Sequence, residues 1–478
     1  MKRVAVHNLG CKVNGYEMDV MVQRLKESGY ELVPFEEQAD VYVINTCTVT
    51  NIADRKSRQM IHKAKHQNPD SIVVAVGCYV ETDEKRIEED SAVDLAIGNN
   101  KKGRIAEILA AYLEEHTGEK SPAASKGSTG ARDSKTPDTS KTLSGRTMED
   151  LAKKPSFESM QLTEPGHTRA YIKIQDGCNQ FCSYCIIPYA RGRIRSRDPE
   201  EIVEEIIGLA SEGVREVVLT GIHICSYGKD KGEEPETALL SLLRRIQMIR
   251  GIERIRLGSL EPRIMTENFV RGIAGLSKLC PHFHLSLQSG CDATLRRMNR
   301  HYTAEEYYAG VTLLRKFFDR PAITTDVIVG FAGETPEEFA ASKAFLAKVN
   351  FYEIHVFKYS MRHGTAAAKM PDQQTPQTKS ERSDELLELT KGQSDVFRRS
   401  FIGEEEELLL EEMVEQDGER YWTGHTKRYV QGLVREAELS RVFGERGREE
   451  GDYEGLLVHG RFTAMARDPH YLLMNDVK

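Results

Sequence analysis

The 478-residue sequence lacks any long hydrophobic run. No apolar stretch approaches the ~18–20 residues that a helix needs to cross a bilayer. The apolar stretch at the start is short and runs straight into a polar turn, which is not typical of a secretory signal. With 39% hydrophobic and 29% charged residues, the composition is that of a soluble globular protein, and we expect a cytoplasmic one.

The sequence also lacks an excess of positive charge and an even set of cysteines. Its net charge is −8, so charge alone does not support nucleic-acid binding, and any RNA contact must come from local basic segments. Nine cysteines without a secretory signal argue against a disulfide scaffold. Metal ligation, catalysis or simple burial are the roles left for these thiols.

The order of apolar and polar segments predicts several domains, as expected for a chain of this length. Residues 1–117 alternate strands and helices, which predicts a doubly wound parallel sheet. Residues 118–155 are rich in Ser, Thr, Gly, Lys and Pro and predict a flexible linker or insert. Residues 160–397 hold six strand-like segments separated by helices, typical of a partial (β/α) barrel. Residues 400–470 predict a small all-β barrel. The fold class is therefore α/β with a C-terminal all-β domain.

Cap signals mark the ends of two of these helices. We predict that Asn14 is the N-cap of the first helix and that Gly29 follows its last turn. Asp198 is the predicted N-cap of a later helix, with Pro199 as its first residue.

The segment "DGCNQFCSYCIIPYARGR" contains Cys178, Cys182 and Cys185 in CxxxCxxC spacing. Three thiolates this close in sequence can bind one face of a [4Fe–4S] cube and leave one iron without a protein ligand. That iron can chelate the amino and carboxylate groups of S-adenosylmethionine. The alternative is a structural zinc ion, which needs four ligands, and no fourth Cys or His lies close by in sequence.

A second set of cysteines lies in the N-terminal domain. Cys11, Cys47 and Cys78 each end a predicted strand, and the carboxyl ends of parallel strands meet at one edge of the sheet. Gly10 and Gly77 precede two of them and permit a tight turn. Free cysteines are also common as small buried residues, but three at one sheet edge predict a second metal cluster with an open iron.

The chain resembles the radical S-adenosylmethionine superfamily, and within it the methylthiotransferase family. The resemblance is carried by the CxxxCxxC motif with an aromatic residue in its last spacer, and by the segments "LTGIH", "LGSLEP", "HLSLQSG", "TTDVIVGF" and "FKYSMRHGT". It implies two [4Fe–4S] clusters, S-adenosylmethionine, and a C-terminal TRAM-like domain that binds RNA. The cofactor-binding residues that it implies are Tyr184, Gly221, Ser259, Glu261, Gln288 and Asp326.

The opening segment "LGCKVNGYEMDVM", together with the later segment "NTCTVTNIADRKSR", resembles the branch of the family that modifies threonylcarbamoyladenosine in tRNA. The isopentenyladenosine branch tends to read "GCQMN", and the branch that modifies a ribosomal-protein aspartate "GCPKN". The resemblance thus implies 2-methylthiolation of N6-threonylcarbamoyladenosine at position 37, beside the anticodon. It also implies an electron donor such as flavodoxin or ferredoxin, and we expect a monomer. The other two branches stay open as alternatives, as does a zinc-stabilised, non-catalytic RNA-binding protein.

Two basic segments are candidates for RNA contacts. The residues predicted to meet phosphates are Arg55, Lys56, Arg58, Lys63, Arg193 and Arg195. The last two belong to a run in which arginines alternate, so an extended chain would point them to one side. A solvated face is an equal alternative for both segments, and some of the arginines can instead support the loop or bind the carboxylate of S-adenosylmethionine.

Overall fold

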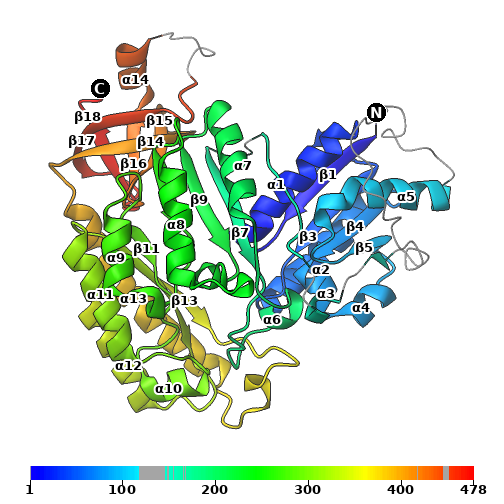
Figure 1. Cartoon of the computed structure of the whole chain (residues 1–478), viewed down its shortest axis with the longest axis horizontal. Helices are drawn as coiled ribbons and strands as arrows, with labels where there is room; N and C mark the ends of the chain where they lie inside the picture. The colour runs from blue at the N-terminus through cyan, green and yellow to red at the C-terminus, as the bar shows by residue number, and fades with distance from the viewer. Residues whose placement is uncertain are drawn as a thin grey trace.

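The computed structural model describes residues 2–117, 146–147, 150–153, 156–164, 166, 168–416, 418–444 and 452–478. It has three units (Figure 1): the N-terminal unit lies against one side of the central unit, and the C-terminal barrel packs at one end of it. No described helix is long and apolar enough to cross a membrane. Most of the linker predicted at 118–155 lies outside the described residues, but Arg146–Thr147 forms a strand, β6, that joins the N-terminal sheet.

The N-terminal unit is a six-stranded sheet in which every neighbouring pair is parallel. In spatial order its strands are β2 (Glu31–Val33), β1 (Arg3–Asn8), β3 (Val41–Thr46), β4 (Ile72–Gly77), β5 (Leu95–Ile97) and β6. Its helices are α1 (Lys12–Glu27), α2 (Asn51–Gln67), α3 (Cys78–Thr82), α4 (Glu84–Glu89) and α5 (Ile105–Thr117). Helices α1 and α5 pack on one face, and α2, α3 and α4 on the other. The predicted doubly wound sheet is confirmed.

The caps partly differ from the sequence predictions. Helix α1 begins at Lys12 with Cys11 as its N-cap, so the prediction for Asn14 is wrong. Asn14 is buried in the first turn, and its amide donates to the carbonyl oxygens of Leu9 and Thr46. The prediction for Gly29 is confirmed by its left-handed φ of 85°, and the cap at Asp198 is confirmed as well.

The central unit has six parallel strands in two sheets, β10–β9–β7 and β11–β12–β13, which isolated parallel bridges connect, with helices outside. This arrangement confirms the predicted partial barrel. Its strands are β7 (Arg169–Asp176), β9 (Glu216–Gly221), β10 (Arg254–Leu257), β11 (His282–His284), β12 (Ala322–Val329) and β13 (Glu353–Lys358). A short antiparallel strand, β8 (Arg195–Ser196), lies beside β7. The α-helices are α6 (Ile187–Ala190), α7 (Pro199–Ser211), α8 (Pro235–Gln247), α9 (Glu267–Ala274), α10 (Asp292–Arg297), α11 (Ala304–Phe317), α12 (Pro336–Val349) and α13 (Pro376–Arg399).

The C-terminal unit is a closed barrel in the order β14–β15–β16–β18–β17. Its elements are β14 (Glu405–Gln416), β15 (Glu419–Thr426), β16 (Gln431–Arg435), α14 (Glu436–Phe443), β17 (Leu457–Met465) and β18 (Tyr471–Asn475). It is joined to the central unit through two buried arginines of β10. Arg254 donates to the carbonyl oxygen of His425, and Arg256 to those of Thr426 and Lys427.

Helix α1 is shared between two hydrophobic cores. Met18, Met21 and Leu25 pack in the core of the N-terminal sheet, whereas Tyr16 and Val20 pack in the core of the central barrel. The helix therefore lies between the two units, next to β7 (Figure 1). Buried polar groups on such a helix must find partners.

The carboxylate of Glu17 on α1 is the most heavily partnered of these groups. It lies 2.5 Å from the Lys102 ammonium and 2.7 Å from that of Lys173, and it also accepts from the Arg191 guanidinium. Asp176 at the end of β7 pairs with Lys173 at 2.7 Å and with Arg191 at 3.3 Å. Burial opposes ionisation of Glu17, but its three cationic neighbours hold its pKa well below the ordinary value. One buried ion cluster thus joins the N-terminal and central units.

We predict that Glu17→Gln costs about 3–5 kcal/mol of stability, because it leaves buried cations without their counter-ion. The melting temperature of the purified protein, followed by circular dichroism, measures the loss. The control is Glu27→Gln on the exposed end of the same helix, which should change little. Equal melting temperatures for the two variants would contradict the role given to the cluster.

Candidate active site

The three N-terminal cysteines lie at the carboxyl edge of the sheet. Cys11 follows β1, Cys47 follows β3, and Cys78 follows β4 as the first residue of α3. These three strands are adjacent in the sheet, and the thiols are close enough for charge on one to raise the pKa of another. The structure therefore brings together the three thiols that the sequence placed at one edge.

Two glycines make this approach possible. Gly10 has φ of +113°, and a Cβ there would lie 3.2 Å from Sγ of Cys47. Gly77 has φ of +100°, and a Cβ there would lie 2.8 Å from the carbonyl oxygen of Thr46. Both positions favour glycine for its backbone conformation and for space, which confirms the turns predicted before Cys11 and Cys78.

The thiol of Cys78 is surrounded by hydrogen-bond donors. Nε of Arg191 lies 3.2 Å from its Sγ, and the side-chain amide of Asn99 lies 3.6 Å from it. Burial raises the pKa of the nearby Cys47 thiol to about 11. Donors aimed at sulfur stabilise a thiolate, and a bound metal replaces the proton that burial otherwise retains.

The second triad occupies the loop after β7. Sγ of Cys178 accepts from the Gln180 amide at 3.4 Å, and Sγ of Cys182 accepts from the Arg300 guanidinium at 3.1 Å. Burial raises the pKa of Cys178 to about 11 and that of Cys185 to about 12. Charge on Cys182 raises the pKa of both Cys178 and Cys185, so the three thiols lie close together.

The closeness of the sulfur atoms bears on the choice between an iron–sulfur cluster and a single zinc ion. Tetrahedral Zn–S bonds of ~2.3 Å place thiolates about 3.8 Å apart. Among the described residues, the one group of three or more ligand-type side chains whose ligand atoms all lie within 4.8 Å of one another is His284, Asp326 and His355. In neither cysteine triad do all three sulfur atoms lie that close together, so neither is set for a tetrahedral zinc ion, and iron–sulfur clusters stay the prediction for both.

The two triads border the same part of the interface between the units. Helix α6 comes two residues after Cys185 and packs on α3, which begins with Cys78 (Figure 1). The Asn99 amide donates both to the carbonyl oxygen of Ala190 in α6, at 2.8 Å, and to Cys78. Arg191, directly after α6, connects Cys78 to the Glu17 ion cluster.

Glu261 is a buried carboxylate beside the second triad. It accepts from Nε2 of His223 at 3.1 Å and from the Gln180 side chain at 3.2 Å. Burial opposes its ionisation, but His223, Arg300 and Arg263 lower its pKa to about 2. Its own backbone N–H donates to Sγ of Cys225 at 3.1 Å. Glu261 is thus a fixed negative charge that can bind a cation or a hydrogen-bond donor.

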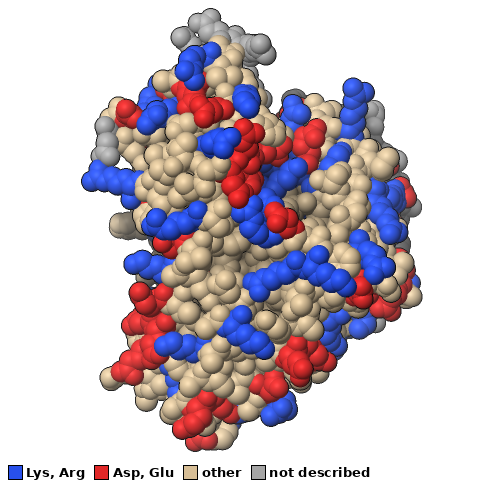
Figure 2. Space-filling model, turned by 90° about the vertical axis from the view of Figure 1, so that its left-hand side faces the viewer, with Lys and Arg blue, Asp and Glu red and all other residues tan. Residues whose placement is uncertain are grey.

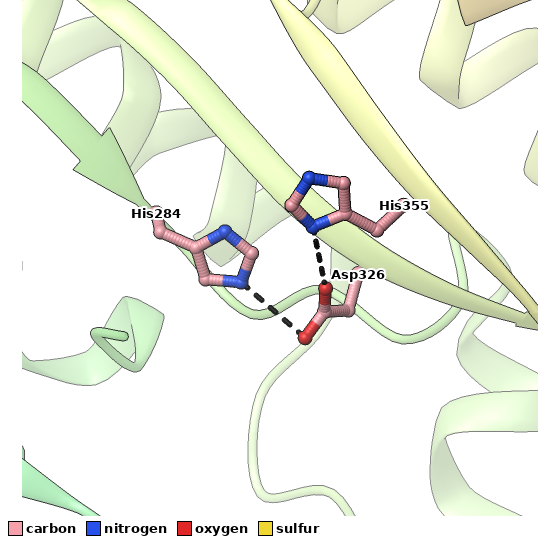
Figure 3. Close-up of side chains that lie close together, drawn as sticks. All are labelled: His284, Asp326 and His355. Atoms are coloured by element: carbon pink, nitrogen blue, oxygen red, sulfur yellow. Dashed lines mark hydrogen bonds and ion pairs between the residues drawn. The ribbon is translucent and has the colours of Figure 1, made fainter. Parts of the chain in front are cut away.

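Asp326 on β12 lies between two histidines (Figure 3). Its two carboxylate oxygens are 3.3 Å from Nε2 of His284 and 3.2 Å from Nδ1 of His355. Burial opposes ionisation, but these two contacts hold the pKa of Asp326 below its ordinary value. Gln288 lies beside it with a left-handed φ of 72°, and its N–H donates to the carbonyl oxygen of Asp326.

The other predicted pocket residues lie at strand ends or in the cysteine loop. Gly221 ends β9, and Ser259 is exposed just after β10. The Tyr184 ring packs edge-on against Phe331 at 6.3 Å. Cofactor binding by these residues stays a prediction.

The basic segments divide into exposed and buried residues. Arg55, Lys56 and Lys63 are exposed on α2, and Arg58 is partly buried, with its guanidinium 3.3 Å from the hydroxyl of Tyr79. The prediction that Arg195 contacts RNA is wrong. It is buried, 3.4 Å from Asp176, and donates to the carbonyl oxygen of Arg191.

Arg193 differs from its neighbour Arg195 because it is partly exposed. Its guanidinium lies over the ring of Phe181, 4.8 Å from the centroid. Such a cation–π contact leaves the rest of the guanidinium able to meet a phosphate.

Sequence reasoning missed three residues that the structure places at the site. Arg191 and Arg300 donate to cysteine sulfurs, and His355 holds Asp326. Arg191 belongs to the alternating arginine run that was considered for RNA contacts, but the sequence did not mark it as a partner of a cysteine. The other two lie far along the chain from their partners, so no local pattern marks them.

Comparison with known proteins gives the class of this site. Residues 172–346 match the Radical SAM superfamily, and residues 3–98 match a group described as Uncharacterized protein family UPF0004. The fold is similar to that of the radical S-adenosylmethionine methyltransferase TsrM from Kitasatospora setae, with a TM-score of 0.52 and 18% identity over 75% of this chain and 72% of that one. The chain is a radical S-adenosylmethionine enzyme, and its class uses S-adenosylmethionine and a [4Fe–4S] cluster.

Curated relatives give the family. The chain is 39% identical over 439 residues to the threonylcarbamoyladenosine tRNA methylthiotransferase MtaB of Bacillus subtilis, covering 92% of this chain and 91% of that protein. It is 34% identical over 422 residues to the tRNA-2-methylthio-N(6)-dimethylallyladenosine synthase of Pelotomaculum thermopropionicum, covering 86% and 87%. The chain belongs to the methylthiotransferase family of radical S-adenosylmethionine enzymes. As a member it is an enzyme, which sets aside the non-catalytic zinc protein.

The contact between Asp326 and His355 should be visible as a raised pKa of His355 when the histidines are titrated. The hydrogen bond that the His355 ring donates to the Asp326 carboxylate raises the pKa of His355 above its ordinary 6.5. The pair's contribution to stability is then complete below about pH 6.5 and is lost as the pH rises through the raised pKa. We expect Asp326→Asn to return the pKa toward 6.5, measured by NMR of histidine side chains.

Glu353→Gln is the matched control, because Glu353 lies farther from His355, at 3.9 Å, and should shift its pKa less. A His355 pKa below 6.5, or one indifferent to Asp326→Asn, would contradict the arrangement.

Proposed function

We propose that this enzyme converts N6-threonylcarbamoyladenosine at position 37 of tRNA, beside the anticodon, into its 2-methylthio derivative. The observation that carries the proposal is the pair of cysteine triads on either side of one domain interface, linked through α3, α6 and Arg191. The relatives support the choice of nucleoside, since the MtaB protein of Bacillus subtilis is named for threonylcarbamoyladenosine.

Two groups of residues would hold the cofactors. Cys178, Cys182 and Cys185 would bind the [4Fe–4S] cluster that receives S-adenosylmethionine. Cys11, Cys47 and Cys78 would bind a second [4Fe–4S] cluster. When bound, these groups supply a 5′-deoxyadenosyl radical and the sulfur that is added at C2 of the adenine.

The chain's own groups position and enclose the reactants. Arg300 and Arg191 each donate to a cysteine sulfur, which stabilises the thiolate form needed for ligation. The carboxylates of Glu261 and Asp326 provide fixed negative charge in the barrel. Beside them, Tyr184, Gly221, Ser259 and Gln288 remain proposed contacts for cofactor or substrate.

The tRNA would approach over the N-terminal unit. Exposed Arg55, Lys56 and Lys63 lie on α2, which begins four residues after Cys47, and Arg193 lies close after the second triad. The alternative surface for tRNA is the face with the C-terminal barrel and the outer helices of the central barrel. On that face Lys and Arg are interspersed with Asp and Glu (Figure 2). We further propose that the enzyme acts as a cytoplasmic monomer and takes electrons from a small carrier such as flavodoxin or ferredoxin.

Cysteine variants test the assignment of the two clusters. Cys78→Ala should lower the iron content of the anaerobically reconstituted enzyme from about eight atoms per chain to about four, because each cube holds four irons. It should retain reductive cleavage of S-adenosylmethionine but form no methylthio product, measured by mass spectrometry of digested tRNA. Cys182→Ala should lose the cleavage itself.

Cys291→Ala is the matched control, because Cys291 lies at the start of α10, outside both triads. It should keep both the iron and the product. Retention of product by Cys78→Ala, or product on dimethylallyladenosine alone in the unaltered enzyme, would contradict the proposed function.

Charge reversal tests the RNA surface. Arg55→Glu combined with Lys56→Glu should raise the KM for tRNA about tenfold or more and reduce its dependence on salt, since phosphate contacts release counter-ions. Lys316→Glu on α11 removes an exposed cation remote from α2 and should leave the KM unchanged. Equal effects of the two changes would show that only net charge matters.

A further inference from the structure

The charged side chains at the start of the barrel strands are matched in pairs. Arg169 lies 3.0 Å from Glu411. Arg256 lies 2.8 Å from Glu216, and Arg254 lies 2.9 Å from Glu407. Each of these cations therefore has its counter-ion from the protein.

Lys12 is different from these arginines. It is the first residue of α1, and among the described residues no hydrogen-bond or ion-pair partner contacts its ammonium group. Its side chain is exposed although α1 lies between two units. Helix α1 packs against β7 and β9 of the barrel, and the charges of Arg256, Arg169, Glu216 and Asp326, which lie on four barrel strands, act on the Lys12 ammonium. The Lys12 ammonium is thus accessible to solvent and, among the described residues, is left without a counter-ion in contact, although charged groups of the barrel act on it.

A cation in such a place calls for an anionic ligand. Burial weakens hydration of an ammonium, and the two barrel carboxylates that act on Lys12 already have partners. Glu216 pairs with Arg256, and Asp326 accepts from His284 and His355. A ligand carboxylate would supply the missing counter-ion. The same cation disfavours a metal ion at the His284, Asp326 and His355 group, because two positive charges would share one small space.

The position of Lys12 in the fold indicates which anionic ligand its ammonium would bind. It directly follows Cys11 of the N-terminal triad. Under the proposed function C2 of the adenine receives its sulfur at that triad, so the base would come close to Lys12. C2 and C6 of adenine flank N1, and N6 is bonded to C6, so a substituent on N6 lies on the same edge of the base as the reacting carbon. The threonylcarbamoyl substituent ends in a carboxylate, whereas the tRNA phosphates lie on the far side of the ribose.

We propose that the Lys12 ammonium binds the carboxylate of the threonylcarbamoyl group and thereby selects this substrate. The inference rests on the proposed function and adds the residue that recognises the modification. Lys12 is a specificity-determining residue, which takes no part in holding either cluster.

The test compares two synthetic anticodon stem-loops. One carries N6-threonylcarbamoyladenosine, and the other carries the same nucleoside with its carboxylate converted to a primary amide. For the reconstituted enzyme with S-adenosylmethionine and dithionite, kcat/KM for the methylthio product should be about 10- to 100-fold higher on the carboxylate, the range of one charge-assisted hydrogen bond.

Variants then assign that preference to a residue. Lys12→Gln should lose about the same 10- to 100-fold on the carboxylate stem-loop, keep its activity on the amide, and keep its iron content and its cleavage of S-adenosylmethionine. Lys12→Arg should retain most of the preference. Lys26→Gln, in the exposed last turn of the same helix, should behave as the unaltered enzyme.

Two results would overturn the proposal. A Lys12→Gln enzyme that loses activity equally on both stem-loops, or that loses iron, would show a role at the cluster. A Lys12→Gln enzyme that keeps the carboxylate preference would place recognition elsewhere. Absence of methylthio product from the unaltered enzyme on the carboxylate stem-loop, with both clusters present, would instead reject the proposed function itself and this role with it.

Discussion

The buried ion cluster around Glu17 is the interaction on which the arrangement of the molecule depends. One carboxylate on α1 faces Lys102 of its own unit together with Lys173 and Arg191 of the central unit. A buried pair of this kind adds little net stability compared with apolar packing, but removal of one member is costly. Its effect here is specificity, because α1 can pack on β7 only in the register that matches these charges.

That register determines the geometry of the site. Arg191 is held by Glu17 and Asp176, and its Nε then points at the sulfur of Cys78. Helix α6, which links the second triad to Arg191, is thereby fixed against α3. The two sets of thiols belong to different units of the chain. The Arg191 guanidinium contacts both units and so fixes their relative position. Arg254 and Arg256 of β10 attach the C-terminal unit to the barrel in a similar way.

Much of the fold and the metal-binding part of the site could be predicted from the sequence. Strand and helix alternation indicated the doubly wound sheet and the partial barrel, and the cysteines were marked by spacing or by strand ends. Short edge strands such as β2 and β6 escaped because three or two residues give no periodic signal. Asn14 was misassigned as a cap because its side chain satisfies buried carbonyl oxygens instead of the helix terminus. Arg195 was misassigned because an alternating run does not reveal which side is buried. Arg300 and His355 depend on contacts between distant strands, which only the folded chain shows.

The central claim is that the two triads hold iron–sulfur clusters on either side of one domain interface, with the start of α1 beside the first triad. The most direct measurement is a crystal structure of the anaerobically reconstituted enzyme with S-adenosylmethionine bound. The account predicts two cubes, each with three cysteine ligands and one open iron, with the open corners facing each other across the space beside Lys12. A single zinc ion at either triad, or cubes that open onto separate surfaces of the molecule, would contradict it.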